Sequence, residues 1–459
     1  MSIASEIERI QRAKTDIKQV IEERGVNVGN VTIDHYAEKI AQIPSGGSEP
    51  SPYPIIEGDG KYEVRFIDYE GTILKIHHVD EHEDAVPPAL PEHENLTFLM
   101  WNNNEYQDVL GDVEVGAAYS TTDNNLYIHH IVTEENGLTK TIPIKGYGAH
   151  GNGKIDWGDG TIENVVFTTT IKFFEHTYAP GEYIIQMECP TRYHLGNSNR
   201  QYSLFGNAVE NPLINSGITK IYTGDNFVGL VTQGLVNAHN LEEFVPAVAY
   251  NFGSTAISGA LKLKCLVLAP QGSGSTSSIT ASCFDTCNLQ YFPLWDAANF
   301  SGFPVRYSQT RRVTFPRNFV LTNGVAYVGY YSPLLEKIVL PHGITTIPNN
   351  LIYWCHSIQE MVFPEGIETI GTYCVYQSRN VRRIVIPSTV TSIGNFAFTG
   401  DASLADLYVY AIEPPVLGGT GCFNTILTTC RIHVPAESLE AYKAATNWSG
   451  QASKMIGDL

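Results

Sequence analysis

The sequence predicts a multidomain, mainly β protein whose second half is a solenoid of stacked repeats. Proline recurs through that half at intervals of 23 to 25 residues. The prolines are Pro246, Pro270, Pro293, Pro316, Pro341, Pro364 and Pro387. The apolar pattern of residues 335–347 recurs 23 residues later at 358–370 and again at 381–393. Because a unit this short cannot bury its own apolar face, neighbouring coils must stack to share a core.

Composition and charge exclude two classes of partner. The 459 residues include 48 acidic and 29 basic side chains, for a net charge of −19, which repels nucleic acid and anionic membrane surfaces. No stretch reaches the roughly 18 apolar residues of a membrane span, so we expect no membrane insertion. The start, MSIASEIERI, lacks the basic flank and apolar run of a secretion signal. We therefore expect the chain to stay in a cytosol until lysis or a dedicated machine releases it.

Residues 1–44 are predicted to form a helical anchor that trimerises the chain. Isoleucines spaced by fours and threes indicate a coiled-coil seam: Ile3, Ile7, Ile10, Ile17 and Ile21. Isoleucine at both seam positions favours three or more strands over two, so we expect a homotrimer. The alternative is an amphipathic helix docked on its own domain. Three heptads are marginal alone, so the anchor should insert into a larger partner, separated from the rest by a Pro, Gly and Ser linker at 45–56.

Residues 57–120 are predicted to form a small β module. Alternating apolar and polar residues in KYEVRFIDYEGTILKIHHV indicate two strands around a turn at Asp68 to Gly71. FLMWNNN and VEVGAAY indicate further strands. The stretch from Tyr62 to Tyr119 resembles the Listeria/Bacteroides repeat of surface proteins, although Met100 stands where that repeat usually has a glycine before its tryptophan. The resemblance implies a β-grasp-like fold.

Residues 121–192 carry strand patterns at the close spacing of a β-sandwich. The motifs WGDGT at 157–161 and HTY at 176–178 resemble the signatures of polycystic-kidney-disease-type domains. This resemblance implies an immunoglobulin-like β-sandwich that acts as a spacer or binding module. We interpret Asp156 and Asp159 as turn formers, because Asp-Gly pairs satisfy tight turns by themselves. A weak calcium site is the alternative.

Residues 210–436 are the predicted solenoid, and residues 437–459 are the predicted helical cap over its last apolar edge. The clearest repeat is VRRIVIPSTVTSIGNFAFTGDAS at 381–403, which resembles the BspA type of leucine-rich repeat. The resemblance covers residues 334–403 and weakens upstream. It implies surface adhesion and recognition of host or microbial ligands, without catalysis.

The first 44 residues are similar to the attachment segment of tail and appendage proteins in phages and prophages of gut bacteria, through SIASEIERIQRAKTDIKQVIEERGV and TIDHYAEKIAQIP. This implies a phage virion structural protein, a tail fibre or appendage that binds the bacterial host surface, assembled in the host cytoplasm and released by lysis. The expected partners are its own copies, other virion proteins through residues 1–44, and a bacterial surface glycan or protein. The alternatives are a phage head fibre, a bacterial surface adhesin and a glycan depolymerase.

The loops that follow the coils are rich in aromatic residues, which stack on sugar rings and anchor protein interfaces. The candidate ligand-binding residues are Tyr330, Tyr331, Trp354, Tyr376 and Arg379. Outward strand positions are apolar instead: Val339, Val362 and Val385 are predicted to form a column that contacts another chain or domain.

No sequence motif indicates catalysis, a cofactor or a metal. The chain lacks a GxSxG elbow, and GSGSTSS at 272–278 lacks the lysine of a P-loop. His77, His78 and His82 lie among acidic residues, but their spacing fits no metal motif, so a solvated hairpin edge is the favoured interpretation. The cysteines are interpreted as small core residues. We expect a binding protein that is not an enzyme.

Overall fold

The computed structural model divides the chain into two compact units, Met1–Pro52 and Tyr53–Leu459. The structure describes residues 54–146, 151–196, 202–230, 234–247, 251–253, 255–268, 277–279, 284–294, 298–300, 309–317 and 331–459. The predicted anchor, its seam isoleucines and the trimer contacts of residues 1–44 lie outside the described residues. Most of the described secondary structure is β. No helix in these residues is long and apolar enough to cross a membrane.

The first sheet contains five strands in the order β1-β3-β2-β5-β4. Their bounds are Ile55–Glu57 (β1), Tyr62–Ile67 (β2), Ile73–Val79 (β3), Leu96–Trp101 (β4) and Val113–Thr121 (β5). β2 and β3 form the predicted antiparallel hairpin, and its turn is closed by a 2.9 Å hydrogen bond from the Gly71 amide to the Asp68 carbonyl. β5 then lies parallel to β2 and antiparallel to β4. Alternate residues of β2, Val64 and Phe66, are fully buried, as the alternating sequence pattern predicts.

The next seven strands form two layers of sheet. Their bounds are Leu126–Val132 (β6), Thr139–Gly146 (β7), Gly151–Asp156 (β8), Ile162–Phe167 (β9), Lys172–Thr177 (β10), Gly181–Glu188 (β11) and Tyr193–Leu195 (β12). β6, β11, β8 and β9 are neighbours in one sheet, and β10, β7 and β12 are neighbours in the other. Trp157 and Tyr193 are fully buried in the shared hydrophobic core, which fits the sandwich pattern of the sequence.

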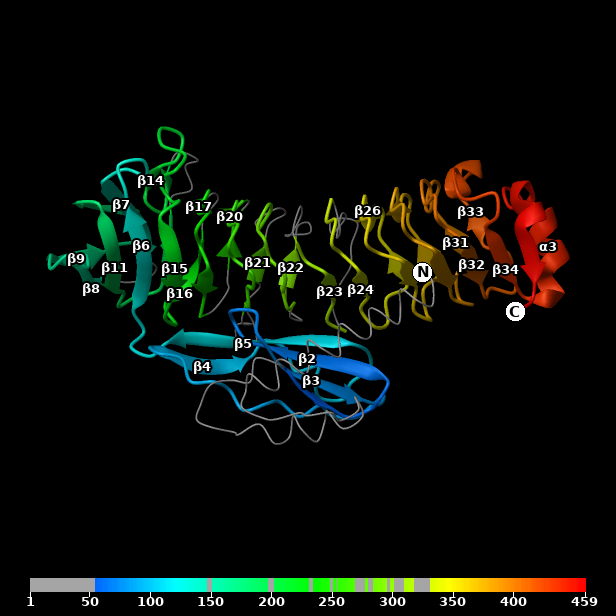
Figure 1. The fold of residues 1–459 in the computed structure, drawn as a ribbon, viewed down its shortest axis with the longest axis horizontal. Helices are drawn as coiled ribbons and strands as arrows, with labels where there is room; N and C mark the ends of the chain where they lie inside the picture. Colours follow the sequence, from blue (N-terminus) through cyan, green and yellow to red (C-terminus); the bar gives the residue numbers. More distant parts are fainter. Residues whose placement is uncertain are drawn as a thin grey trace, which may run out of the picture. The chain divides into compact units, whose positions relative to one another are not determined.

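Both of these sheets continue into the solenoid (Figure 1). β15 (Ile218–Tyr222) pairs with β6, and β16 (Phe227–Leu230) pairs with β12. The sheet that contains β6 ends with β18, and the sheet that contains β12 runs on through β19, β21 and β22; the bounds are Glu243–Val245 (β18), Asn251–Phe252 (β19), Ser277–Ile279 (β21) and Ala298–Phe300 (β22). One hydrophobic cluster extends from Leu126 to Met455. Residues 121–192 therefore cover the first coil and share its core.

The remaining strands are short, and in the coils they repeat with the period of the sequence. Their bounds are Tyr202–Ser203 (β13), Gly206–Asn207 (β14), Leu235–Val236 (β17), Ile257–Ser258 (β20), Arg312–Thr314 (β23), Lys337–Val339 (β24), Thr346–Ile347 (β25), Ile352–Tyr353 (β26), Glu360–Val362 (β27), Thr369–Ile370 (β28), Val375–Tyr376 (β29), Arg383–Ile386 (β30), Ser392–Ile393 (β31), Asp406–Val409 (β32), Val416–Leu417 (β33) and Arg431–Val434 (β34). Met361 of β27 pairs with Ile384 of β30, which pairs with Leu407 of β32, all in parallel. These three residues are almost fully buried, so the solenoid predicted from the repeat is confirmed.

Three glycines in the coils allow consecutive coils to approach closely. A Cβ atom on Gly371 would lie 2.6 Å from the backbone nitrogen of Asn349, and one on Gly418 would lie 2.6 Å from that of Asn395. A Cβ atom on Gly394 would lie 2.5 Å from a backbone nitrogen of the preceding coil. Real Cβ atoms do not approach backbone this closely, so the stacking distance of these coils depends on glycine.

The C-terminal cap is made of short helices and one added strand. Its elements are Ala436–Ser438 (η4), Leu439–Ala444 (α3), Ser449–Lys454 (η5) and Met455–Gly457 (β35); a further short helix, Thr420–Phe423 (η3), lies earlier, between β33 and β34. β35 extends the sheet by pairing with β34. The indole of Trp448 donates to the Pro415 carbonyl at 2.7 Å, and the hydroxyl of Tyr442 donates to the Ala411 carbonyl at 2.7 Å. Both rings are fully buried, so two aromatic residues and an added strand close the last coil.

The first sheet packs against the coils instead of standing apart as a separate spacer (Figure 1). The side-chain amides of Asn102 and Asn103 donate to the carbonyls of Pro293 at 2.8 Å and Leu294 at 3.1 Å. Ile67 and Ala118 of the first sheet also share a small hydrophobic cluster with Cys265 and Val267 of the solenoid. The sequence predicted modules in series, and this side-by-side contact was not predicted.

Candidate functional site

The candidate site begins with a backbone conformation that recurs once per coil. Tyr331, Trp354, Gln377 and Gly400 are each 23 residues apart, and their φ angles are 52°, 58°, 54° and 88°. The amide of Trp354 donates to the Tyr376 carbonyl of the next coil at 3.1 Å, and that of Gln377 donates to the Thr399 carbonyl at 2.9 Å. The backbone amide of this left-handed residue therefore makes a hydrogen bond to the next coil. Gly400 suits this conformation, whereas tyrosine and tryptophan rarely adopt it.

Aromatic rings follow this backbone column from coil to coil. We call the set the aromatic column, and its members are Tyr331, Tyr353, Trp354, Tyr373, Tyr376 and Phe396. The ring centroids of Tyr331 and Trp354 are 5.0 Å apart. Those of Tyr373 and Phe396 are 5.2 Å apart with planes only 5° from parallel. Tyr331 is exposed and the other rings are partly exposed, so the column presents aromatic surface to solvent.

The structure brings together three of the five candidate ligand-binding residues. Tyr331, Trp354 and Tyr376 belong to the aromatic column, and Tyr330 lies outside the described residues. Arg379 is exposed three residues beyond Tyr376. Tyr353 was missed, although subtracting one period of 23 residues from Tyr376 would have found it.

Two of the three residues in the predicted valine column are register partners. Val362 of β27 pairs with Val385 of β30, whereas Val339 lies on β24, which pairs with β23. Val362 is 52% exposed. In the next two coils the row becomes aromatic, because Tyr408 and His433 take the place of valine. Their rings stack with centroids 4.3 Å apart.

Beside these valines runs a ladder of alternating charge. Glu360, Arg383, Asp406 and Arg431 are register partners on β27, β30, β32 and β34. Arg383 pairs with Glu360, and Arg431 pairs with Asp406 at 2.9 Å. Opposite charges at directly opposed strand positions stabilise a sheet by a few tenths of a kcal/mol per pair, up to about 1 kcal/mol. The alternating charges on this face therefore stabilise the coils, and no ligand is needed to explain them.

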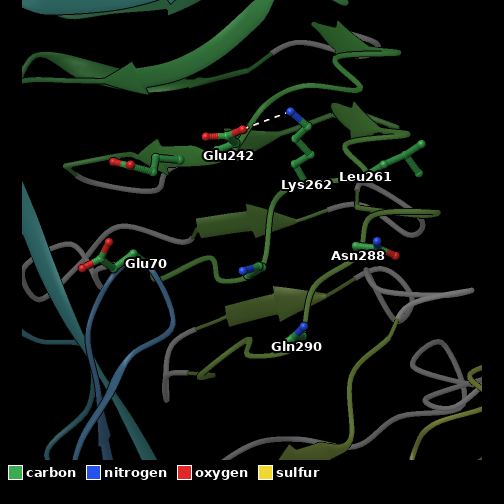
Figure 2. Close-up of a pocket in the computed structure, with 8 residues that line it drawn as sticks. Glu70, Glu242, Leu261, Lys262, Asn288 and Gln290 are labelled. Atoms are coloured by element: carbon green, nitrogen blue, oxygen red, sulfur yellow. Dashed lines mark hydrogen bonds and ion pairs between the residues drawn. The ribbon is translucent and has the colours of Figure 1, made fainter. Parts of the chain in front are cut away.

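A polar cleft of about 500 Å³ lies between the first sheet and the solenoid (Figure 2). It is lined by Glu70, Glu242, Glu243, Leu261, Lys262, Lys264, Asn288 and Gln290. Lys262 pairs with Glu242 at 3.1 Å. Glu243 pairs with Lys220 at 2.6 Å and accepts a 3.3 Å hydrogen bond from the Tyr69 hydroxyl. The cleft thus combines carboxylates, amines and amides, which are suited to a polar ligand.

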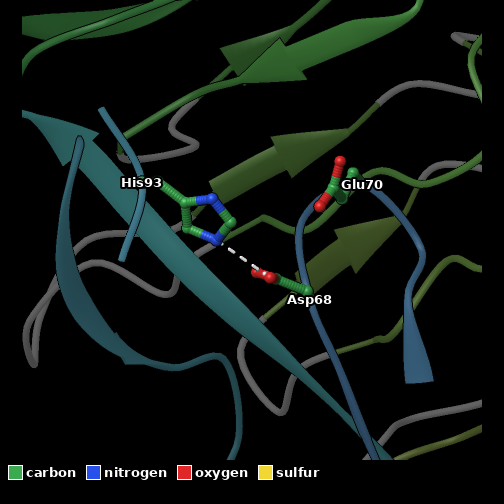
Figure 3. A group of neighbouring side chains, drawn as sticks. All are labelled: Asp68, Glu70 and His93. Atoms are coloured by element: carbon green, nitrogen blue, oxygen red, sulfur yellow. Dashed lines mark hydrogen bonds and ion pairs between the residues drawn. The ribbon is translucent and has the colours of Figure 1, made fainter. Parts of the chain in front are cut away.

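A mixed group of two carboxylates and an imidazole adjoins this cleft (Figure 3). One donor atom each from Asp68, Glu70 and His93 lies within 4.8 Å of the others. Asp68 and Glu70 come from the β2–β3 turn, and His93 comes from the segment before β4. The His93 Nε2 lies 2.9 Å from the Asp68 Oδ2. Sequence reasoning missed the group because 25 residues separate Asp68 from His93.

The histidines singled out in the sequence have separate partners. His77 Nδ1 accepts from the Val86 amide at 3.0 Å, and His82 Nδ1 lies 2.8 Å from Asp108. His78 Nε2 lies 3.9 Å from Glu63. These contacts agree with the interpretation of a hairpin edge.

The aspartates in and just before the WGDGT motif form turns, as predicted. Asp156 accepts from the Gly158 amide at 3.0 Å, and Asp159 accepts from the Thr161 amide at 2.9 Å. The second oxygen of Asp159 lies 2.7 Å from His176 Nε2. This hydrogen bond is the main cause that lowers the pKa of Asp159 to about 2. The carboxylates of Asp156 and Asp159 are therefore engaged in hydrogen bonds with Gly158, Thr161 and His176.

The comparisons with known proteins agree with the repeat geometry. The BspA type leucine rich repeat region family matches residues 325–412 in six copies. These coils are BspA-type leucine-rich repeats. The match covers the later part of the repeat region and leaves the earlier coils, the first sheet and the sandwich unassigned. No curated protein matches the chain.

Two solved structures are similar to parts of the chain. A leucine-rich repeat protein from Bacteroides ovatus is 15% identical with a TM-score of 0.36, over 47% of this chain and 60% of that one. A leucine-rich repeat protein from Eubacterium ventriosum is 13% identical with a TM-score of 0.26, over 52% of this chain and 75% of that one. The match thus spans less than two thirds of the B. ovatus protein.

Proposed function

We propose that this protein recognises a bacterial surface glycan or protein through the aromatic column of its leucine-rich repeats. The observation that carries the proposal is the left-handed backbone at Tyr331 and Trp354. A left-handed L-residue costs roughly 1–2 kcal/mol, and the same position in the two later coils is held by Gln377 and Gly400. Residues with strained backbone conformations cluster at functional sites. We therefore infer a functional role for the aromatic side chains at these positions.

The chemistry of the column defines what it can bind. Aromatic faces pack against the C–H faces of sugar rings, and partly buried tyrosine and tryptophan side chains anchor protein interfaces. Rings in consecutive coils, such as Tyr353 and Tyr376, offer repeated contacts along one edge. A repeating polymer or an extended protein surface matches such a row better than a small compact molecule does.

The place of the protein in a phage virion is the second part of the proposal. In this account residues 1–44 form a homotrimeric anchor that attaches to other virion proteins, and the chain acts as a tail fibre or appendage. Residues 57–120 are a β-grasp-like module and residues 121–192 an immunoglobulin-like module that position the repeats. The support is the sequence resemblance of residues 1–44 together with the five-stranded first sheet and the two-sheet sandwich.

The experiment uses the full chain, fluorescently labelled, and a panel of intact gut bacteria. Saturable binding to particular strains, competed by unlabelled protein, is the expected result. Absence of binding to every strain would contradict the recognition role. Mass spectrometry of purified phage particles tests the virion role separately, because an adhesin would instead be recovered from bacterial envelopes. If incubating the protein with capsular glycan releases new reducing ends, the protein is a depolymerase, and the proposal of a purely binding role is wrong.

A further inference from the structure

We propose that Asp68, Glu70 and His93 bind a divalent metal ion, with Zn²⁺ as the best match, at the edge of the polar cleft (Figure 3). This inference is independent of the aromatic column. Two features of the turn place the ligands. The Gly71 amide closes the turn onto the Asp68 carbonyl, and Asp68 and Glu70 are two residues apart on it. His93 approaches from a different segment, so the three donors converge from two sides.

The first supporting observation is the fixed position of Asp68. Its carboxylate is 1% exposed and accepts a 2.9 Å hydrogen bond from the Tyr69 amide through Oδ1. The other oxygen, Oδ2, is the atom that faces His93. One oxygen is thus used to hold the side chain and the other is directed into the group. This arrangement pre-orders a metal ligand in the way that outer hydrogen bonds do in metal sites.

The second, independent observation is the hydroxyl of Tyr119. Tyr119 is 2% exposed, and within the described residues its hydroxyl makes no hydrogen bond of normal geometry. The hydroxyl lies close enough to the Asp68 carboxylate for a weak hydrogen bond between them to raise the pKa of the phenol, after burial and the charge of Asp68. Its ring packs against His93 with centroids 5.0 Å apart. Buried hydroxyls normally have a partner, so the unsatisfied hydroxyl marks a position prepared for a further polar atom.

The charge around the group favours a cation. Glu70 and Glu243 line the cleft, the buried Asp68 carboxylate lies within 4.8 Å of that of Glu70, and Lys220 pairs with Glu243. The Asp68 and Glu70 carboxylates each bring an oxygen within 4.8 Å of the other, so their negative charges repel. A divalent ion beside Asp68 and Glu70 would relieve this repulsion. On binding, the ion takes the place of the proton between Asp68 and His93, and that proton leaves to solvent.

The donor set selects the class of metal. One imidazole nitrogen with two carboxylate oxygens suits Zn²⁺ better than Ca²⁺ or Mg²⁺, which prefer sites made of oxygen alone. Three protein ligands leave the fourth tetrahedral position of Zn²⁺ open. Glu70 also lines the cleft, so an oxygen atom of a ligand in the cleft could complete the coordination.

The test is titration of the full chain with ZnCl₂ by isothermal calorimetry after chelator treatment. We expect one saturable site of micromolar affinity that is weakened at least tenfold in Glu70→Gln and in His93→Asn. Glu70 is exposed, so its replacement should leave the fold intact. Glu134→Gln, another exposed glutamate far along the sequence, is the matched control and should bind as the wild type does.

Two results would overturn the proposal. One is the absence of any saturable Zn²⁺ binding to the wild type. The other is equal affinity in wild type, Glu70→Gln and Glu134→Gln, which would assign the binding to other histidines of the chain. Thermal unfolding of each variant in EDTA verifies that the fold is unchanged, and a Zn²⁺-dependent rise in the wild-type midpoint that Glu70→Gln lacks gives a second readout.

Discussion

Tyr376 stacks on Tyr353, which precedes it by 23 residues, with ring centroids 4.9 Å apart and ring planes 29° apart. Both residues end a two-residue strand, β29 or β26, and the two strands are parallel neighbours in register. One period of the sequence therefore becomes one step of the aromatic column. The coils thus set the spacing between the rings of the proposed binding surface.

Gly394→Ala should destabilise the coils by about 1–3 kcal/mol, the usual cost of inserting atoms into a packed region. The new Cβ would lie 2.5 Å from the backbone nitrogen of Thr372, and backbone cannot move aside cheaply. The measurement is the urea midpoint followed by circular dichroism. Gly450→Ala is the control, because nothing lies within 4 Å of its Cβ position. Equal midpoints for the two variants would contradict the close-stacking account.

Asp401→Asn should stabilise the protein more at pH 7 than at pH 4. Burial raises the pKa of Asp401 well above its usual value, and the 3.1 Å hydrogen bond from the Ser378 amide only partly opposes this. The other carboxyl oxygen has no partner among the described residues. As pH rises through the unfolded pKa near 4, only the unfolded state ionises, so wild-type stability falls until the folded pKa is reached.

The side-chain amide of the Asp401→Asn variant cannot ionise, so the substitution removes this pH-dependent loss. A gain of about 1–3 kcal/mol at pH 7 is expected, the scale of one unsatisfied buried polar group. The measurement is the difference in unfolding midpoint between variant and wild type at the two pH values. Asp59→Asn, at an exposed position, controls for the lost negative charge. A difference that does not grow with pH would count against a buried, uncharged Asp401.

Arg312→Met should loosen the first sheet from the solenoid. The buried guanidinium pairs with Glu63 at 3.0 Å and Asp112 at 3.2 Å, and its Nε lies 3.8 Å from fully buried Glu114. Removing one partner of a buried charge network costs about 3–5 kcal/mol. Limited proteolysis between the first sheet and the solenoid is the measurement, and faster cleavage is the expected result.

The neighbouring Arg311 supplies the control for this prediction. Its side chain is 61% exposed and pairs with Glu336, and exposed pairs contribute about 0–1 kcal/mol. Arg311→Met should therefore be cleaved as slowly as the wild type. Adding Glu114→Gln to Arg312→Met should restore part of the resistance, because burial raises the pKa of Glu114 and its charge is then the costly group. Equal cleavage of the Arg311 and Arg312 variants would refute the docking role.

Local patterns of the sequence predicted local structure well. The 23-residue period placed Ile358, Met361 and Ile370 in the core, and all three are buried. The alternating pattern around Asp68 predicted the β2–β3 hairpin, and Asp156 and Asp159 predicted the turns that they form. These features depend on neighbours in the chain or on a regular repeat, which is the information that periodicity contains.

Contacts between distant segments were beyond the sequence patterns. Arg312 meets Glu63 across 249 residues, and nothing in either local pattern indicates the other. The continuous sheet from β6 into β15 depends on pairing across a predicted domain boundary. The Asp68, Glu70 and His93 group required two segments to converge, whereas the sequence patterns pointed to closely spaced residues such as His77, His78 and His82.

The most direct test of the central claim compares the binding of Trp354→Ala and Tyr410→Ala to the bacterial strain that the wild-type chain binds best. Both residues are aromatic, but Tyr410 is exposed outside the aromatic column. The account predicts at least tenfold weaker binding for Trp354→Ala, the scale of a binding hot spot, and unchanged binding for Tyr410→Ala, with both variants folded by circular dichroism. Wild-type affinity in Trp354→Ala would contradict the proposal that the aromatic column is the recognition surface.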